Sequence, residues 1–185
     1  YSEIAEDINN ARIILEGKKL EFTEAKVSNF KSFSDERLAS YDELFKVPLE
    51  KVTSITTNGG QYSSNAIARA MDGDVNTNWH SGKQNTSSHT NEVIITLNEL
   101  TTIDRMMYTS LVSRGFAQEF EIYGSRTSEG DTFEKISSGS TSITTKNTLQ
   151  IKFKETEVRR IKFVYKKGYE NWALAYEFGL YMPDE

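Results

Sequence analysis

Short runs in which apolar and polar residues alternate dominate the chain from Val52 onward. In "FEIYGS" Phe120 and Ile122 fall on one face, while Glu121 and Tyr123 fall on the other. A period of two residues is typical of half-buried antiparallel strands. The runs of this kind are "EVIITL", "IDRMMYTSL", "EFEIYGS", "LQIKFK", "RRIKFVYK" and "FGLYM". The polar clusters "RTSEGD" and "SSGSTS" between them are predicted to be turns.

Between these runs we find no helical pattern of the roughly 10–15 residues that connects parallel strands. A parallel α/β sheet is therefore not expected. About six to eight short strands joined by long polar loops predict an all-β fold, a jelly-roll β-sandwich.

The pattern before Pro48 is different. Apolar residues recur at helical spacing in two segments, Ile4, Ile8, Ala11 and Leu15 in the first and Leu38, Tyr41 and Phe45 in the second. The segment between them, "KKLEFTEAKV", suits a strand or a helix equally. We therefore predict a mostly helical N-terminal appendage or linker over residues 1–47, and a β module over residues 48–185.

Composition narrows the function further. The 185 residues include no cysteine, so disulfides and thiolate metal sites are excluded. The formal net charge is −5 and the Lys and Arg residues are dispersed, which argues against a nucleic-acid partner. No apolar run reaches the roughly 20 residues of a membrane-spanning helix, and no signal peptide is evident. The beginning at Tyr1 suggests a piece of a longer polypeptide.

The loop "MDGDVNTNWHS" over residues 71–81 holds the most distinctive chemistry. Asp72 and Asp74 offer hard oxygen donors, Gly73 permits a tight bend, and Thr77 adds a hydroxyl and a carbonyl. Such oxygens suit calcium, although the loop lacks the Glu that ends an EF-hand loop. The alternative is a polar turn held by Asx side-chain bonds.

Five segments in order resemble the discoidin-like (coagulation factor type C) domains, above all the family 32 carbohydrate-binding modules. These segments are "NAIARAMDGDVNTNWHS", "NEVIITLNELTTIDRMMY", "FAQEFEIYGSRTSEGDTFEKI", "RRIKFVY" and "NWALAYEFGLY". The resemblance covers about residues 50–182 and implies a galactose-binding-domain-like jelly roll. The form with "NEV" in place of the usual tryptophan before the strand is most similar to modules of secreted bacterial glycosidases and mucin-degrading metallopeptidases.

The resemblance also implies one structural calcium ion. Its ligands would be the carbonyls of Arg69 and Tyr176, the side chains of Asp72 and Glu177, and side-chain or carbonyl oxygens of Asp74 and Thr77. Because Glu177 comes from the other end of the module, the ion would tie the first loop to the last strand. The energy of metal binding would then stabilise the fold.

The same resemblance implies sugar contacts on three loops, by His80, Arg114, Phe116, Tyr169, Asn171 and Trp172. A neutral imidazole both donates and accepts hydrogen bonds, and a guanidinium can reach two sugar oxygens at once. The alternatives are a surface histidine without a ligand for His80, and a core position for Phe116 and Trp172. Trp79 is expected in the core. Many galactose binders have an aromatic residue where this chain has Lys83, which favours an N-acetylated sugar.

We therefore predict a non-catalytic carbohydrate-binding module of a secreted or wall-bound bacterial enzyme. It would attach its parent to terminal Gal, GalNAc or GlcNAc units of host or mucin-like glycans. One alternative is a small glycoside-active enzyme, whose mark would be a cleft with two facing carboxylates. The other is a discoidin domain that binds protein or lipid, but the Asn-, Ser- and Thr-rich loops favour sugars.

Overall fold

A computed structural model of the chain describes residues 44–110, 114–141 and 147–184. Almost all of the predicted helical appendage over 1–47 lies outside these residues. The strands are β1 (Val52–Thr57), β2 (Trp79–His80), β3 (Glu92–Ser110), β4 (Ala117–Ser125), β5 (Glu134–Ser140), β6 (Asn147–Gly168), β7 (Leu174–Ala175) and β8 (Glu177–Tyr181). The 3-10 turns are η1 (Leu49–Lys51), η2 (Ile67–Met71) and η3 (Tyr169–Asn171).

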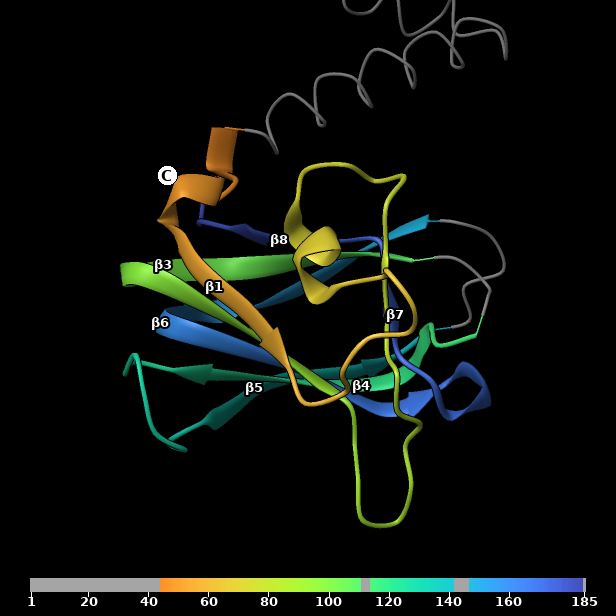
Figure 1. Cartoon of the computed structure of the whole chain (residues 1–185). Coiled ribbons are helices and arrows are strands. Elements are labelled where there is room, and N and C mark those ends of the chain that lie inside the picture. Colours follow the sequence, from red (N-terminus) through yellow and green to blue (C-terminus); the bar gives the residue numbers. More distant parts are fainter. Residues whose placement is uncertain (1–43, 111–113, 142–146, 185) are drawn as a thin grey trace, which may run out of the picture. The chain divides into compact units, whose positions relative to one another are not determined.

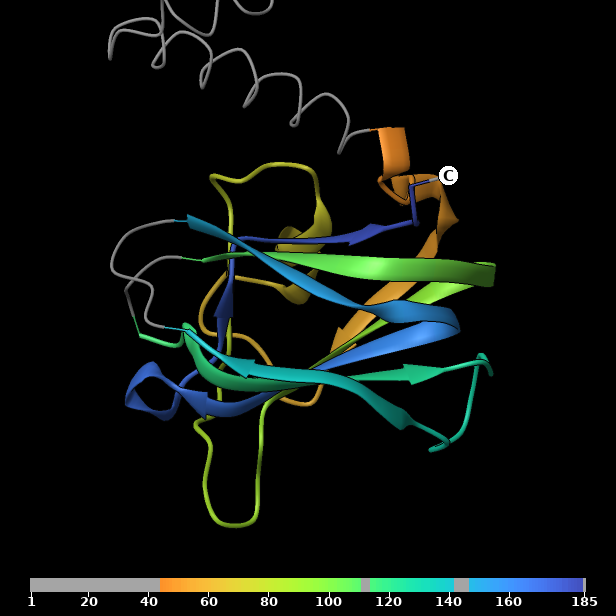
Figure 2. The same cartoon turned by 180° about the vertical axis from the view of Figure 1, so that it is seen from behind.

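The strands confirm the prediction of an all-β sandwich. One sheet runs in the order β1-β3-β6-β4-β5, with β8 also paired to β3, and β2 and β7 form a separate two-stranded ladder (Figure 1). Every pairing is antiparallel. The view from behind shows the same order of strands (Figure 2).

The two longest strands differ from the sequence prediction. "EVIITL" and "IDRMMYTSL" join into β3, and "LQIKFK" and "RRIKFVYK" join into β6. The pairing of β3 with β6 shifts register between Thr96 and Thr101 and again between Ile103 and Arg105. Such irregularities bend and twist strands without ending them. The first half of β3 can therefore pair with β1 while its second half pairs with β8.

The predicted turn "SSGSTS" is wrong over residues 137–140, which lie in β5. The strand pairs with β4 and places Gly139 opposite Phe120. A Cβ at Gly139 would lie 2.7 Å from the Phe120 ring, so only glycine lets the two strands approach here. The residues of β5 are mostly small and polar, so this strand lacks the apolar alternation that predicted the others. The other predicted turn, "RTSEGD", does connect β4 to β5.

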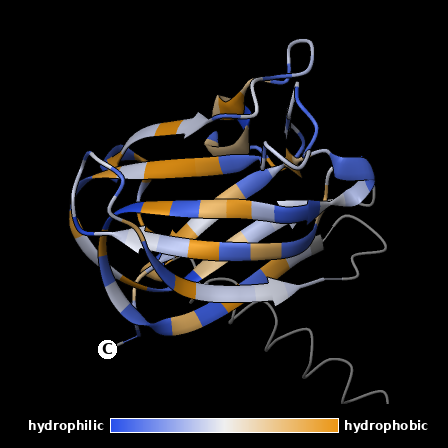
Figure 3. Cartoon of the chain, turned by 90° about the horizontal axis from the view of Figure 1, so that it is seen from below, coloured by the Kyte–Doolittle hydropathy of each residue, from blue (hydrophilic) through white to orange (hydrophobic). Residues whose placement is uncertain are grey.

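Apolar and polar positions alternate along the strands (Figure 3). The apolar side chains form a core between the inner faces of the strands. Tyr108 stacks on Phe163 and Phe178, with ring centroids 5.1 and 5.5 Å apart. The buried hydroxyls of Tyr108 and Tyr165 both donate to the carbonyl of Leu174, at 2.6 and 3.0 Å. These bonds satisfy polar atoms that would be costly to bury alone, and they fix β7 over the core.

The compact unit begins at Phe45. The N–H of Val47 donates to the carbonyl of Leu180, and the N–H of Met182 donates to that of Phe45. Val47 is also buried in the core. Residues 45–47 therefore extend the β module by a few residues beyond the predicted start at 48. The described part of the chain has no helix with the length and apolar character needed to cross a membrane.

Candidate functional site

The ladder of β2 and β7 presents His80. Trp79 pairs with Ala175 and His80 pairs with Leu174. Because neighbouring residues of a strand point to opposite faces, a buried Trp79 places the next side chain on the outer face. Trp79 is fully buried, as predicted, and its indole N–H donates to the carbonyl of Gly60 at 2.8 Å. The tryptophan thereby anchors the loop around Gly60 to β2, the strand that carries the imidazole.

The imidazole of His80 has a defined tautomer. Its Nδ1 lies 2.8 Å from the carbonyl oxygen of Ser81. A carbonyl can only accept, so Nδ1 carries the proton and Nε2 of the neutral ring is an acceptor. Within the described residues Nε2 makes no hydrogen bond. The site therefore offers an acceptor that suits a hydroxyl of a ligand.

Two aromatic rings lie next to this imidazole. The centroids of Tyr62 and Trp172 each lie 5.4 Å from that of His80, and both rings are tilted against it. Sequence reasoning missed Tyr62. The sequence feature that could have indicated it is a large aromatic residue inside the polar loop "NGGQYSSN", where a core role is not expected. The structure brings Tyr62, His80 and Trp172 together from three separate segments.

Arg114 and Phe116 lie on a loop that is bonded to η3. The N–H of Gly115 donates to the carbonyl of Tyr169, whose own N–H donates to the carbonyl of Phe116. The ring of Phe116 is buried and stacks on Tyr169 at 5.5 Å, so it supports that tyrosine from below. The guanidinium of Arg114 is exposed and pairs with the carboxylate of Glu170 at 2.9 Å.

The turn η3 is held in an uncommon backbone conformation. Glu170 and Asn171 have φ of 52° and 65°. Such values cost energy in residues with a side chain and persist only where surrounding bonds enforce them. The carbonyl of Asn171 accepts from the N–H of Asn85 at 2.6 Å, and that of Glu170 accepts from the Gln84 amide at 3.1 Å. These bonds fix the turn, leave the Asn171 side chain exposed, and position Trp172.

A second cluster of oxygens surrounds the hydroxyl of Thr77. It lies 2.7 Å from Asp72 Oδ2, 3.2 Å from the carbonyl of Asp74 and 3.4 Å from the carbonyl of Arg69. One hydroxyl proton can satisfy only one of these three acceptors. The arrangement is rich in hard oxygens and poor in donors, which fits a calcium ion.

The carboxylate of Glu177 is directed at the same loop. Its Oε1 accepts from the N–H of Gly73 at 3.3 Å, and its Oε2 is buried without a hydrogen-bond partner. Burial raises the pKa of Glu177 to about 7, and the nearby negative charge of Asp72 adds to this effect. A buried oxygen without a partner beside a second carboxylate is the environment that a bound cation would relieve.

The other two candidate calcium ligands have distinct positions. The side chain of Asp74 turns away and accepts from the N–H and the amide of Asn76 at 2.9 and 3.0 Å. Only its carbonyl faces Thr77, so the donor set combines two carboxylates with carbonyls. In agreement, no three acidic, His or Cys side chains converge as a metal site among the described residues. Tyr176 directly precedes Glu177, and its N–H donates to the carbonyl of Thr109.

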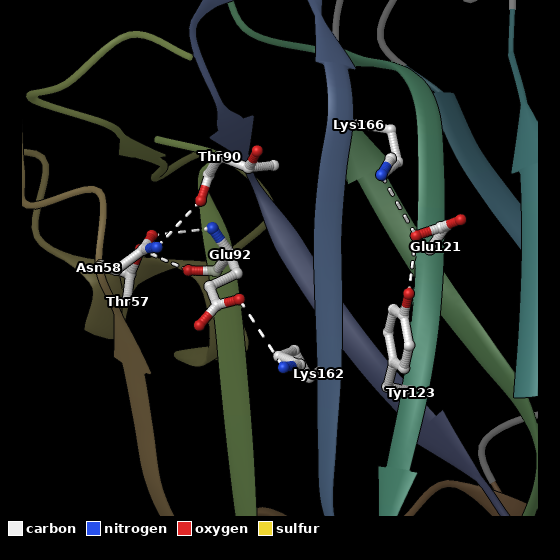
Figure 4. A network of polar contacts seen from close by, with 8 residues as sticks. All are labelled: Thr57, Asn58, Thr90, Glu92, Glu121, Tyr123, Lys162 and Lys166. Carbon is white, nitrogen blue, oxygen red and sulfur yellow. Dashed lines mark hydrogen bonds and ion pairs between the residues drawn. The ribbon is translucent and has the colours of Figure 1, made fainter. Parts of the chain in front are cut away.

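Charged residues also cross the outer face of the sheet (Figure 4). Lys162 approaches Glu92 at 3.8 Å, and Glu121 lies 3.6 Å from Lys166. The hydroxyl of Tyr123 donates to Glu121 at 2.8 Å. These groups pair with one another along the strands, which leaves the loops around His80 as the better place for a polar ligand.

A depression of about 500 Å³ lies at the far end of β4, where β4 turns into β5. Glu134, Glu155 and Glu157 line it, and Arg126 pairs with Glu157. Ala117 begins β4 beside the Arg114 loop, and the nine residues of the strand extend over roughly 30 Å. The depression is therefore separate from the His80 site, which is a shallow surface between loops.

Three comparisons relate the chain to known proteins. The family model of the F5/8 type C domain matches residues 51–178. The search of curated proteins found no match. Among solved structures, the CBM32-1 and CBM32-2 domains of Clostridium perfringens ZmpB are 44% identical, with a TM-score of 0.74 and 80% of this chain covered. The same two domains in complex with GalNAc are 43% identical, with a TM-score of 0.76 and 82% of this chain covered.

A longer ZmpB structure that includes the M60 catalytic domain is 43% identical, with a TM-score of 0.76 and 84% of this chain covered. The chain spans 39%, 40% and 17% of these three chains, respectively. The family 32 module of C. perfringens NanJ, solved with galactose, is 16% identical with a TM-score of 0.64, and it shows the shared fold.

Proposed function

This chain belongs to the F5/8 type C domain family over residues 51–178, and we propose that it is a module that binds carbohydrate. The domain is a non-catalytic binding module. Its proposed ligands are terminal Gal, GalNAc or GlcNAc units of host or mucin-like glycans. The similar ZmpB domains solved with GalNAc support this assignment.

The observation that carries the proposal is the imidazole of His80 beside two aromatic rings. Its Nε2 is an acceptor because Nδ1 is bonded to Ser81. The rings of Tyr62 and Trp172 offer apolar surface next to it. A sugar has both features that match, because its hydroxyls form hydrogen bonds and its C–H groups pack on aromatic rings.

The remaining candidate residues extend this site. Arg114, Tyr169 and Asn171 lie on the two loops next to Trp172, and the Arg114 guanidinium would reach a sugar while its Glu170 partner holds it in place. Phe116 contributes by supporting Tyr169. Because Lys83 stands where many galactose binders have an aromatic residue, we retain the preference for an N-acetylated sugar.

We further propose that the module attaches a secreted or surface-bound bacterial enzyme to its substrate surface. The ZmpB structure that joins two similar modules to a catalytic domain supports this arrangement. A calcium ion held by Asp72, Glu177, Thr77 and the carbonyls of Arg69, Asp74 and Tyr176 is proposed to stabilise the fold without touching the ligand.

The test is calorimetric titration of the chain with galactose, GalNAc and GlcNAc. His80→Ala should weaken binding about five- to a hundredfold, since a lost hydrogen bond in such a site costs roughly 1–3 kcal/mol. His89→Ala is the matched control, because that ring makes a single hydrogen bond within the described residues, to Asn91 at 3.3 Å, and it should bind like the wild type. A wild type that binds no glycan on an array but binds phospholipid vesicles would instead support the lipid-binding alternative.

A further inference from the structure

We infer that Tyr62 forms a second subsite, which takes the next pyranose ring of a glycan whose terminal sugar lies at His80. This inference rests on the proposed function and deepens it. It assigns the module a ligand of two linked sugars, with Tyr62 recognising the second one. Tyr62 is exposed, its backbone is fixed by hydrogen bonds, and the residues around it are exposed as well.

Tyr62 is more exposed than the other aromatic residues of the site. Its exposed fraction is 60%, against 37% for Tyr169, and Trp172 is half-buried. Tyrosine is enriched at binding surfaces, because its ring offers a large apolar area and its hydroxyl a polar tip. The ring also lies in contact range of His80, at 5.4 Å, so a ligand at His80 meets this exposed face next.

The backbone at Tyr62 is fixed from several directions. Its N–H donates to the carbonyl of His80 at 2.8 Å, and its own carbonyl accepts from the N–H of Asn65 at 3.1 Å. The following residue, Ser63, has φ of 53°, a conformation that costs energy for a residue with a side chain. The Gln61 amide donates to the Ser63 carbonyl at 2.9 Å and helps to hold this turn.

The strained turn therefore fixes the point from which the Tyr62 side chain extends. A backbone that is already ordered loses little entropy on binding, which favours a platform role. Strain beside an exposed aromatic residue is also the usual sign of a backbone shaped by function.

The residues around Trp172 already have a place in the proposed site. The turn η3 directly precedes Trp172 and is bonded to Gln84 and Asn85. Arg114 and Glu170 pair at the outer edge of this turn. Those residues are assigned to the terminal sugar, whereas residues 61–64 beside His80 are all exposed, so a glycan can extend from His80 over Tyr62. The second sugar therefore packs its C–H face on Tyr62.

The experiment compares monosaccharides with disaccharides. Galactose, GalNAc and GlcNAc are titrated into the wild type by calorimetry, followed by disaccharides that carry each of them at the non-reducing end. The measured quantity is the ratio of disaccharide to monosaccharide affinity for each pair. One stacking contact should raise this ratio to about three- to tenfold for at least one disaccharide.

In Tyr62→Ala this ratio should fall to about one, whereas Tyr62→Phe should keep it. Leu100→Ala is the matched control: it removes an exposed apolar side chain of β3, next to the Lys51–Glu99 ion pair, and should leave the ratio unchanged. The inference is overturned if no disaccharide binds better than its monosaccharide, or if Tyr62→Ala lowers both affinities by the same factor. A wild type that binds none of these sugars would overturn the proposed function itself.

Discussion

At the scale of single residues, Tyr108 illustrates how a polar atom is satisfied inside the core. Its hydroxyl donates to the carbonyl of Leu174 and accepts from the N–H of Ala117 at 3.1 Å. Burial raises the pKa of Tyr108 to about 12, because the ionised form would be desolvated. Burial also raises the pKa of Tyr165, well above its ordinary value. Both hydroxyls must therefore stay protonated in the folded protein.

The sign of the resulting pH dependence follows from linkage. Below about pH 10 both tyrosines are protonated in the folded and unfolded chains, so they add no pH dependence. Between about pH 10 and 12 only the unfolded chain loses the protons, so the free energy of unfolding falls as the pH rises. Urea unfolding across this range should show a steep loss of stability.

Tyr108→Phe should lower the free energy of unfolding by about 1–3 kcal/mol at neutral pH, since the N–H of Ala117 loses its acceptor. It should also reduce the alkaline loss, because one of the two buried hydroxyls is gone. Tyr62→Phe, which removes a hydroxyl from an exposed ring, is the control and should change neither quantity. An alkaline transition that is the same in Tyr108→Phe as in the wild type would contradict the argument.

At the scale of elements, the site depends on how closely the 114–116 loop lies against β7. Gly115 has φ of 101°, and a Cβ there would lie 2.7 Å from the carbonyl carbon of Ala173. An alanine at this position would have to push the loop off β7, and the bond from its N–H to Tyr169 would be lost. The loop and η3 would then move apart.

We expect Gly115→Ala to lower the free energy of unfolding by more than about 2 kcal/mol and to weaken sugar binding as well. Gly130→Ala is a matched control, because φ there is 83° but the nearest atom to a new Cβ is Thr132 Oγ1 at 3.9 Å. It should cost only the backbone penalty of about 1 kcal/mol and leave affinity intact. Thermal melts and titrations measure both. Equal losses in the two variants would show that close approach to β7 is unimportant.

At the scale of the whole molecule, the oxygen cluster connects two distant parts of the chain. The loop over residues 69–77 meets Glu177, which begins β8. Without a disulfide, a cation at this point would be the strongest link between the first loop and the last strand. Calcium should therefore raise the melting temperature and EDTA should lower it, by mass action on the folded state.

The pH dependence of this effect also has a defined sign. In the cation-free protein the pKa of Glu177 is about 7, above the 4.5 of an unperturbed carboxyl, so stability declines as the pH rises between these values. Calcium must displace the proton from Glu177. The rise in melting temperature on adding calcium should thus be small near about pH 5.5 and largest near about pH 8.

Glu177→Gln should abolish the response to calcium and make the cation-free protein less sensitive to pH. Glu92→Gln, which removes a carboxylate that pairs with Lys162 on the outer face of the sheet, should respond to calcium like the wild type. Identical melting curves of the wild type in calcium and in EDTA at about pH 8 would remove the basis for the cation.

The alternation of apolar and polar residues determined the class of fold and the position of most strands. A period of two is a local property, because each side chain points opposite to its neighbour whatever the rest of the chain does. The sequence thus predicted β4 and β8 almost to the residue. It divided β3 and β6 into separate runs, because bulges that let a strand bend depend on the partner strands. It missed β5, whose small polar residues are placed by pairing with β4.

The candidate site, too, was predicted in part from the sequence and decided in part by the tertiary structure. Asp72 and Thr77 are five positions apart, so the sequence alone indicated that their oxygens meet. Only the tertiary structure turned the Asp74 side chain away and placed the Phe116 ring beneath Tyr169. The other contacts of the site join residues that are far apart in sequence.

Tyr62, His80 and Trp172 become neighbours because the ladder of β2 and β7, the Trp79 anchor and the bonds of Asn85 fix where three loops lie. No local pattern carries that information. The sequence indicated His80 and Trp172 as candidate sugar contacts but not Tyr62, and the long-range pairing of strands decided which side chains meet.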